Sequence, residues 1–167
     1  MELLEGEIVE KMPQDSPHAT AIRRCERLLN HSFTTDHIVQ VQLPLALGLR
    51  SEPEPDVAVV AGSIADYEDS HPTTAILVIE ISDSTLRVDR GLKASLYART
   101  GIPDYWILNL GQRVLEVHRR PEPQRGKRLG YGYETIQTVP ETESIAPLAA
   151  PDASILVADL LPRRRGE

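Results

Sequence analysis

The segment Ile76–Ile81 reads Ile-Leu-Val-Ile-Glu-Ile and places one carboxylate inside an otherwise apolar run. A short apolar run bounded by polar turn residues is typical of a strand that is buried on both faces. Because alternate side chains of a strand share a face, Glu80 should point to the same side as Val78 and Ser82. A buried carboxylate is costly unless it is paired or holds a metal ion, so we expect this strand to carry a functional site.

A second carboxylate and a lysine lie on either side of this strand in the sequence. Asp56 opens another apolar run, Val57–Val60, and the predicted helix 89–100 carries Lys93. If the two strands are neighbours, Asp56 and Glu80 would point into one pocket. Two carboxylates beside a backbone carbonyl form an oxygen site that suits Mg²⁺ or Mn²⁺. The Lys93 ammonium would then stabilise negative charge on a phosphate or orient the attacking water.

The spacing alone allows two interpretations of this helix. Asp89, Lys93 and Tyr97 are four residues apart and therefore share one face. The apolar stripe beside that face consists of Val88, Leu92 and Leu96. In the first interpretation, Lys93 reaches Glu80 from the border of the buried face. In the second, Asp89 and Lys93 form an ordinary helix pair with Lys93 solvated, and Glu80 is satisfied by Arg90 or a backbone group.

The order of these residues resembles a known superfamily. Pro-Asp, an apolar strand, Glu in a second strand and then Lys is similar to the PD-(D/E)XK nucleases, although the position two residues after the Glu holds Ser82 instead of Lys. A longer stretch of the sequence resembles the Uma-type restriction endonuclease family of that superfamily, in which the Lys stands in the following helix. The residues that carry this resemblance are EPEPDVAVV followed by LVIEISDSTLRVDRGLKASLYARTGIPDYWILNL. The opening LLEGEIVEKMPQDSPHA also resembles this family, so the likeness covers nearly the whole chain.

The resemblance implies a Mg-dependent endonuclease that hydrolyses phosphodiester bonds of DNA and leaves a 5′-phosphate and a 3′-hydroxyl. Matched by position, Asp56, Glu80 and Lys93 would be the catalytic residues. Asp56, Glu80 and the carbonyl of Ile81 would hold Mg²⁺ (or Mn²⁺). The accompanying signature consists of Asp89-Arg90-Gly91, Tyr97 and Pro103-Asp104-Tyr105-Trp106. Members of the family look like homodimers, which would suit cleavage of two strands.

Two other functions are compatible with the same residues. One is a catalytically inactive member of the fold that binds nucleic acid or a protein, which the serine at position 82 and the acidic composition favour. The other is a hydrolase that acts on a different phosphate-bearing substrate. Divalent-metal binding that depends on Asp56 and Glu80 would separate these possibilities.

Composition limits the domain organisation and the setting. The 167 residues fit one domain over 1–162, with 163–167 expected to be a flexible tail. The net charge of −7 argues against a broad basic surface for nucleic acid. The single cysteine, Cys25, excludes an internal disulfide and fits a reducing cytoplasm. No run is apolar enough to span a membrane, so we expect a cytoplasmic protein without a membrane partner.

The remaining pattern predicts an α/β or α+β fold. A helix should begin at Ser16-Pro17, with the serine as its cap, and run to about Asn30; the residues facing the core would be His18, Ile22, Cys25 and Leu29. Strands are predicted for residues 7–12, 36–49, 57–60, 76–81, 104–110, 114–119, 129–139 and 155–157. The resemblance implies that these form a restriction-endonuclease-like central mixed sheet flanked by helices.

Three further features could take part in the site. Glu7 is a candidate for an additional acid, with a solvated strand-end charge as its alternative. Gln40 or Gln42 could reach the pocket, although solvent exposure is the simpler prediction. The segment 119–128 is the best candidate for phosphate contact, with a solvated hairpin tip as its alternative. Its basic residues are Arg119, Arg120, Arg125, Lys127 and Arg128.

Overall fold

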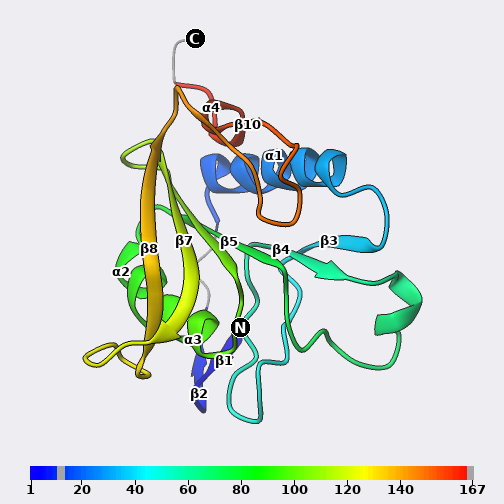
Figure 1. Cartoon of the computed structure of the whole chain (residues 1–167), viewed down its shortest axis with the longest axis vertical. Coiled ribbons are helices and arrows are strands. Elements are labelled where there is room, and N and C mark those ends of the chain that lie inside the picture. Colours follow the sequence, from blue (N-terminus) through cyan, green and yellow to red (C-terminus); the bar gives the residue numbers. More distant parts are fainter. Residues whose placement is uncertain (11–13, 165–167) are drawn as a thin grey trace.

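The computed structural model describes residues 1–10 and 14–164. Its centre is a six-stranded sheet with the strand order β3-β4-β5-β6-β7-β8 (Figure 1). The strands are β3 His37–Val41, β4 Val57–Ala61, β5 Leu77–Ser82, β6 Asp104–Asn109, β7 Val114–Pro123 and β8 Tyr131–Pro140. Only β5 and β6 run parallel, and the other neighbours are antiparallel. The sheet is therefore mixed, as predicted.

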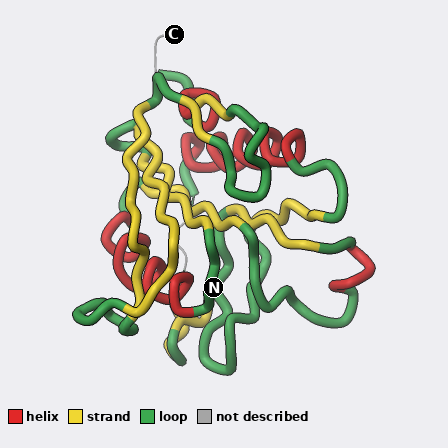
Figure 2. The backbone as a smooth tube through the Cα atoms, in the orientation of Figure 1, coloured by secondary structure: helices red, strands yellow, loops and turns green. Residues whose placement is uncertain are grey.

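Helices cover both faces of this sheet (Figure 2). Helices α1 (Ser16–Ser32) and α4 (Val157–Leu160) lie on one face. The other face carries a continuous helical segment made of α2 (Leu86–Val88), the π-helical turn η2 (Asp89–Lys93) and α3 (Ala94–Arg99). This segment connects β5 to β6, because parallel neighbours cannot be joined by a tight hairpin.

Short elements complete the described part of the chain. They are the antiparallel pair β1 (Glu2–Leu4) and β2 (Glu7–Val9), the 3₁₀ turn η1 (Ile64–Tyr67), and the antiparallel pair β9 (Ser144–Ile145) and β10 (Ile155–Leu156). The 3₁₀ turn lies in the polar stretch between β4 and β5. Among the helices that the structure describes, none is both long and apolar enough to cross a membrane.

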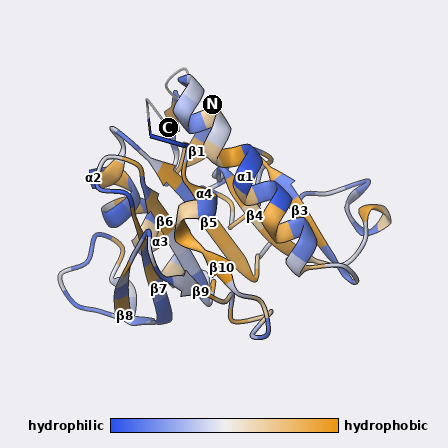
Figure 3. Cartoon of the chain, turned by 90° about the horizontal axis from the view of Figure 1, so that it is seen from above, coloured by the Kyte–Doolittle hydropathy of each residue, from blue (hydrophilic) through white to orange (hydrophobic). Residues whose placement is uncertain are grey.

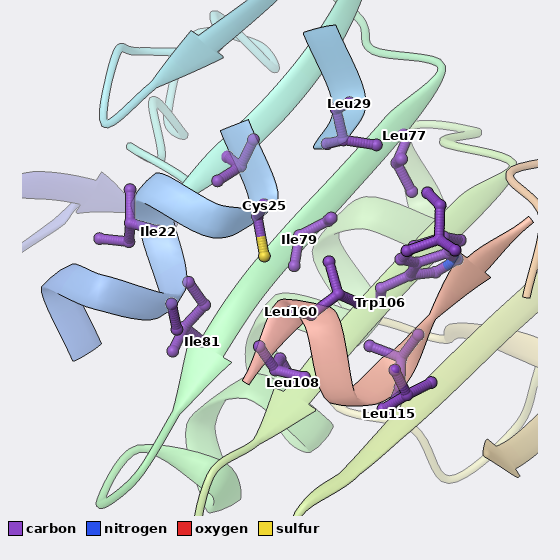
Figure 4. Close-up of a cluster of buried hydrophobic side chains, with 14 of the residues drawn as sticks. Ile22, Cys25, Leu29, Leu77, Ile79, Ile81, Trp106, Leu108, Leu115 and Leu160 are labelled. Carbon is purple, nitrogen blue, oxygen red and sulfur yellow. The ribbon is translucent and has the colours of Figure 1, made fainter. Parts of the chain in front are cut away.

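Helix α1 forms for local reasons and docks through one apolar stripe. Its cap is Asp15, whose side chain accepts the His18 backbone N–H at 3.0 Å, so the predicted Ser16 cap was one residue late. Ile22, Cys25 and Leu29 are buried as predicted. Figure 4 shows these side chains directed at the sheet face that carries Ile79, Ile81 and Trp106.

The opposite face of the sheet forms a second core beneath α3. Ala58, Val60 and Val78 alternate with the residues of the first core, as the period of two along a strand requires. They pack with Tyr105 of β6 and Leu96 of α3. In Figure 3 the central strands β4 and β5 are coloured hydrophobic, whereas α1 shows both hydrophilic and hydrophobic residues. Any polar side chain on this second face of β5 is therefore buried below the α2–η2–α3 segment.

The predicted extended region 36–49 forms only one short strand. Strand β3 ends at Val41, because Gln42 takes a left-handed conformation with φ 53°. The following segment is irregular and still buries Leu45. Gln40 is buried, and its amide donates to the Leu43 carbonyl at 3.4 Å. Its predicted solvent exposure was therefore wrong.

The two ends of the chain also differ from the prediction. The strand predicted for residues 7–12 ends at Val9, and residues 11–13 lie outside the described part. The strand predicted for 155–157 stops at Leu156, where α4 begins. Within the predicted tail, Arg164 forms an ion pair with Glu141, and residues 165–167 are not described. The single-domain boundary and the flexible tail stay predictions.

Candidate functional site

Strands β4 and β5 bring the two predicted carboxylates together. The register pairs Val57 with Ile79, and extending it by one residue sets Asp56 opposite Glu80. The Asp56 carboxylate accepts the Ile81 backbone N–H at 2.8 Å. Asp56 and Glu80 are only 4% and 2% exposed. Strand periodicity predicted this juxtaposition on the condition that the two strands are neighbours, and they are.

Lys93 reaches the same place from the helical segment. Its Nζ lies 3.0 Å from Glu80 Oε1 and 3.2 Å from Glu2 Oε1, and the residue is 4% exposed. The Tyr97 hydroxyl also donates to Glu80 Oε1, at 2.7 Å. Arg90 is engaged elsewhere, with Glu116 of β7. The interpretation that made Lys93 solvated and paired Glu80 with Arg90 is therefore wrong.

The helical segment is rotated relative to the prediction. It begins at Leu86, three residues early, and its π-helical turn places the Ala94 N–H on the Asp89 carbonyl, five residues back. As a result Val88, predicted to be part of the buried stripe, is 43% exposed, whereas Asp89 and Lys93 are buried. Single π-helical turns are rare and occur frequently at functional sites.

Three residues of the site were missed or misplaced at the sequence level. Glu2 of β1 is buried, pairs with Lys93, and accepts the Glu54 backbone N–H at 3.1 Å. His18 was predicted to face the core, but its Nε2 lies 3.3 Å from Asp56 Oδ2. Asp89 was considered only as part of the signature and as a helix partner of Lys93, yet it lines the pocket.

The signals for these residues were weak or pointed elsewhere. No periodicity marks a strand as short as β1, and His18 fitted the helical stripe of the core. Glu7, the predicted additional acid, is exposed on β2 and does not line the pocket. Glu2 supplies an additional carboxylate there in its place. Gln42 does not line the pocket either.

The pocket around these groups has a volume of about 360 Å³ and is strongly acidic. Its carboxylates belong to Glu2, Glu10, Asp15, Asp56, Glu80, Asp83 and Asp89. Among the described lining residues, only Lys93 and His18 can carry positive charge. A larger open pocket of about 540 Å³, between the end of α1 and residues 149–155, contains none of the predicted site residues.

The charges in the pocket fix the protonation of its lysine. Burial alone would lower the pKa of Lys93, but the carboxylates of Glu80, Glu2 and Asp89 outweigh it and raise the pKa above its ordinary value. Lys93 is therefore charged at neutral pH. Burial next to Glu80 also raises the pKa of Tyr97 well above its ordinary value, so its hydroxyl stays a donor.

At Asp89 the effect of burial on the pKa outweighs that of the neighbouring charge and hydrogen bond. Burial raises its pKa, although the Lys93 ammonium and a hydrogen bond from Thr85 Oγ1 at 2.6 Å act against that rise. The ionised carboxylate of Asp89 is therefore only partly compensated by its surroundings.

The donor set fits a hard divalent cation. Asp56, Glu80 and the Ile81 carbonyl are oxygen ligands of the kind that Mg²⁺ and Mn²⁺ prefer. Residues 1–10 and 14–164 contain no group of three histidine, cysteine or acidic side chains placed to hold a metal. Water and substrate oxygens would complete the coordination, as is usual for Mg²⁺.

The basic segment 119–128 is only partly available. Arg119 belongs to β7 and donates to Asp104 at 2.8 Å, and Arg120 pairs with Glu134 at 3.2 Å. The three basic residues left at the exposed hairpin tip are Arg125, Lys127 and Arg128. No residue of this segment lines the acidic pocket.

The chain has a restriction-endonuclease-like fold, because its mixed central sheet and flanking helices match a solved nuclease structure over nearly their whole length. The structure is similar to the crystal structure of a putative nuclease belonging to DUF820 from Anabaena variabilis, with a TM-score of 0.71 and 17% identity over 95% of this chain and 88% of that chain. The type IIG restriction endonuclease BpuSI matches with a TM-score of 0.43 and 17% identity, over 73% of this chain and 14% of that one.

The family follows from the sequence comparison. A family model described as "Uma2: Putative restriction endonuclease" matches residues 1–161, so the chain belongs to this family. The comparison with curated proteins finds no match. Family and fold together make the chain a nuclease-family protein, as its sequence motifs indicated.

Proposed function

We propose that this chain is a metal-dependent endonuclease that hydrolyses phosphodiester bonds of DNA, with Asp56, Glu80 and Lys93 as its catalytic residues. The observation that carries the proposal is the buried contact of Lys93 Nζ with Glu80 Oε1 at 3.0 Å, in a pocket that Asp56 also lines. Membership of a restriction-endonuclease family supports DNA as the substrate.

The two carboxylates and the Ile81 carbonyl would hold Mg²⁺ (or Mn²⁺). A divalent ion bound there would lower the pKa of a water molecule and neutralise charge on the phosphate under attack. The protein orients these ligands beforehand. The Ile81 N–H fixes the Asp56 carboxylate, and the Tyr97 hydroxyl fixes that of Glu80.

Lys93 would act through its charge and its hydrogen bonds. Because its pKa is raised, the amine does not accept a proton at neutral pH and is unsuited to be a general base. An ammonium has three N–H donors, and contacts with Glu80 and Glu2 account for two. The third can donate to a phosphate oxygen or to the attacking water, which stabilises the developing negative charge. A homodimer would supply the two sites that cleavage of both strands requires.

The deciding experiment is a calorimetric titration with Mn²⁺ on the wild type, Glu80→Gln and Glu141→Gln. Glu141 is the matched control, because it is an ion-paired glutamate outside the pocket. We expect one ion to bind to the wild type and the control, and binding to be lost in Glu80→Gln. Cleavage of supercoiled and single-stranded DNA should follow the same pattern. Absence of binding at millimolar Mn²⁺, together with absence of cleavage, would refute the proposal.

The second candidate is a catalytically inactive member of the fold that binds nucleic acid or a protein. It is favoured by the bonds from Lys93 and Tyr97 to Glu80 Oε1, which compensate this buried charge without a metal. It predicts that Asp56→Ala leaves the affinity for the partner unchanged. It also predicts that no divalent metal supports cleavage.

A further inference from the structure

The π-helical turn that presents Lys93 is attached to the sheet at two points behind the pocket. The Asp89 carbonyl accepts the Tyr105 hydroxyl of β6 at 2.9 Å, in addition to the Ala94 N–H. One residue later, Arg90 Nε donates to both carboxylate oxygens of Glu116, at 3.1 and 3.0 Å. The turn is thus bonded to two neighbouring strands.

The attachment at Glu116 is a rigid one. This residue lies within β7, with Ile107 and Thr138 as its partners on the two adjacent strands. Its side chain is buried, whereas the Arg90 side chain is 48% exposed. A guanidinium bonded to both oxygens of a carboxylate fixes orientation as well as distance.

The surroundings of Glu116 keep its carboxylate ionised. Burial would raise its pKa, but His118 and Arg90 lower it to about 2. His118 Nε2 lies 3.6 Å from Glu116 Oε2, and the His118 ring packs against Tyr105 with a centroid separation of 5.4 Å. The two attachment points of the turn are therefore in contact with each other through His118.

We propose that Arg90 and Glu116 are positioning residues that hold the π-helical turn in place and thereby direct the Lys93 ammonium into the pocket. A π-helical turn has one more residue than the α-helical turn it replaces. Conversion to regular α-helix would rotate the residues on either side of it by about 100° relative to each other. Lys93, at the end of the turn, would then project in a different direction relative to the segment that precedes the turn. The effect on reaction rate rests on the proposed nuclease function, whereas the effect on Lys93 does not.

The kinetic test compares Glu116→Gln and Arg90→Ala with the control Glu141→Gln. We expect kcat per folded molecule to fall roughly 10- to 100-fold in the first two, since small displacements of a catalytic group have effects of that size. KM should change less than about twofold, because the interaction that is lost is made in the transition state. Arg90→Lys should recover part of the loss. Unchanged kcat in folded variants would overturn the proposal.

A second measurement reports on Lys93 without any assay of activity. The chain has three lysines, Lys11, Lys93 and Lys127, so lysine-labelled protein should give three Nζ signals in NMR, and Lys93→Arg assigns one of them. In Glu116→Gln and Arg90→Ala the Lys93 signal should shift or broaden, while that of Lys127 stays in place. Arg90 is half exposed, so its variant should fold even if Glu116→Gln does not.

The two measurements separate failure of this inference from failure of the proposed function. If the wild type cleaves no DNA but the Lys93 signal moves in the variants, the nuclease proposal fails and the positioning role stands. If the Lys93 signal is unchanged in folded variants, the positioning role is wrong whatever the activity. Glu141→Gln must leave the Lys93 signal unchanged, because its ion pairs with Arg113 and Arg164 join other parts of the chain.

Discussion

At the scale of single residues, the candidate site is a group of buried charges that depend on one another. Lys93 is held by Glu80 and Glu2, and Glu80 is held in addition by Tyr97. Removing one partner of a buried ion pair leaves the other uncompensated and destabilises a protein by about 3–5 kcal/mol. Activity of any variant in this pocket must therefore be compared at equal fractions of folded protein.

Asp89 offers a prediction with a defined sign. Its pKa is raised in the folded state, so the folded protein loses stability as pH rises through that pKa, and the loss is complete above it. Asp89→Asn removes this loss. We expect the variant to have a larger free energy of unfolding in urea than the wild type at neutral pH. The difference should vanish below the ordinary aspartate pKa of 3.8, where the carboxyl is protonated in both states.

The control for this prediction is Asp83→Asn, because Asp83 is an exposed carboxylate at the rim of the same pocket. It should change the free energy of unfolding by less than about 0.5 kcal/mol. A less stable Asp89→Asn protein at neutral pH would mean that the attraction of Lys93 outweighs the burial of Asp89.

At the scale of elements, sequence patterns describe the connection from β5 to β6 only in part. Helical spacing predicted a helix and placed Asp89, Lys93 and Tyr97 on one face. It also predicted that the apolar stripe is buried, but Val88 of that stripe is exposed. A π-helical turn shifts the helix by one residue, but it requires no particular amino acids. Hydrophobic periodicity in the sequence therefore cannot reveal it.

Gly91 tests how this turn tolerates a side chain. No atom lies within 4 Å of the position that a Cβ would take, and its φ is not in the left-handed region. Alanine has a helix propensity better than glycine by about 0.8–1 kcal/mol. Gly91→Ala should therefore raise the free energy of unfolding by up to about 1 kcal/mol, measured by urea denaturation.

Gly101 is the matched control for Gly91. A Cβ there would also meet no atom within 4 Å, but its φ is +77° at the end of α3. Gly101→Ala should destabilise the protein by about 1–2 kcal/mol, because only backbone conformation distinguishes the two sites. A destabilised Gly91→Ala would show that the π-helical turn, and not the available space, requires glycine.

At the scale of the whole molecule, charge constrains how DNA could approach. The net charge is −7, and acidic side chains dominate the pocket. The exposed residues Arg125, Lys127 and Arg128 form a local exception at the tip between β7 and β8. Phosphate contacts of this tip can be counted from the salt dependence of DNA binding, because every neutralised phosphate contributes to it.

The prediction for this tip is made with Arg125→Ala, Lys127→Ala and Arg128→Ala combined. If all three residues contact phosphates of duplex DNA, the slope of log K against log salt should decrease in magnitude by about 2.7. Affinity should fall equally for unrelated sequences, as measured by fluorescence anisotropy in Ca²⁺ to prevent cleavage. Arg120→Ala is the control, since Arg120 already pairs with Glu134. An unchanged slope would make the tip a solvated hairpin.

The sequence by itself determined the central strands and the faces that Asp56 and Glu80 occupy on them. Apolar runs and the period of two along a strand are local properties, and they fix which face each residue occupies. They left the position of Lys93 open, because helical spacing allowed this residue either to reach Glu80 or to be solvated. The contact with Glu80 was decided by the tertiary structure.

Only the tertiary structure decided which distant groups complete the pocket. Glu2 arrives from the β1–β2 pair, His18 from the first turn of α1, and Arg90 turns away to Glu116 on β7. These contacts join segments far apart in the chain, so they depend on how the strands and helices stack and not on any local period. A charged side chain has no preferred partner in sequence; folding decides which opposite charge is buried beside it.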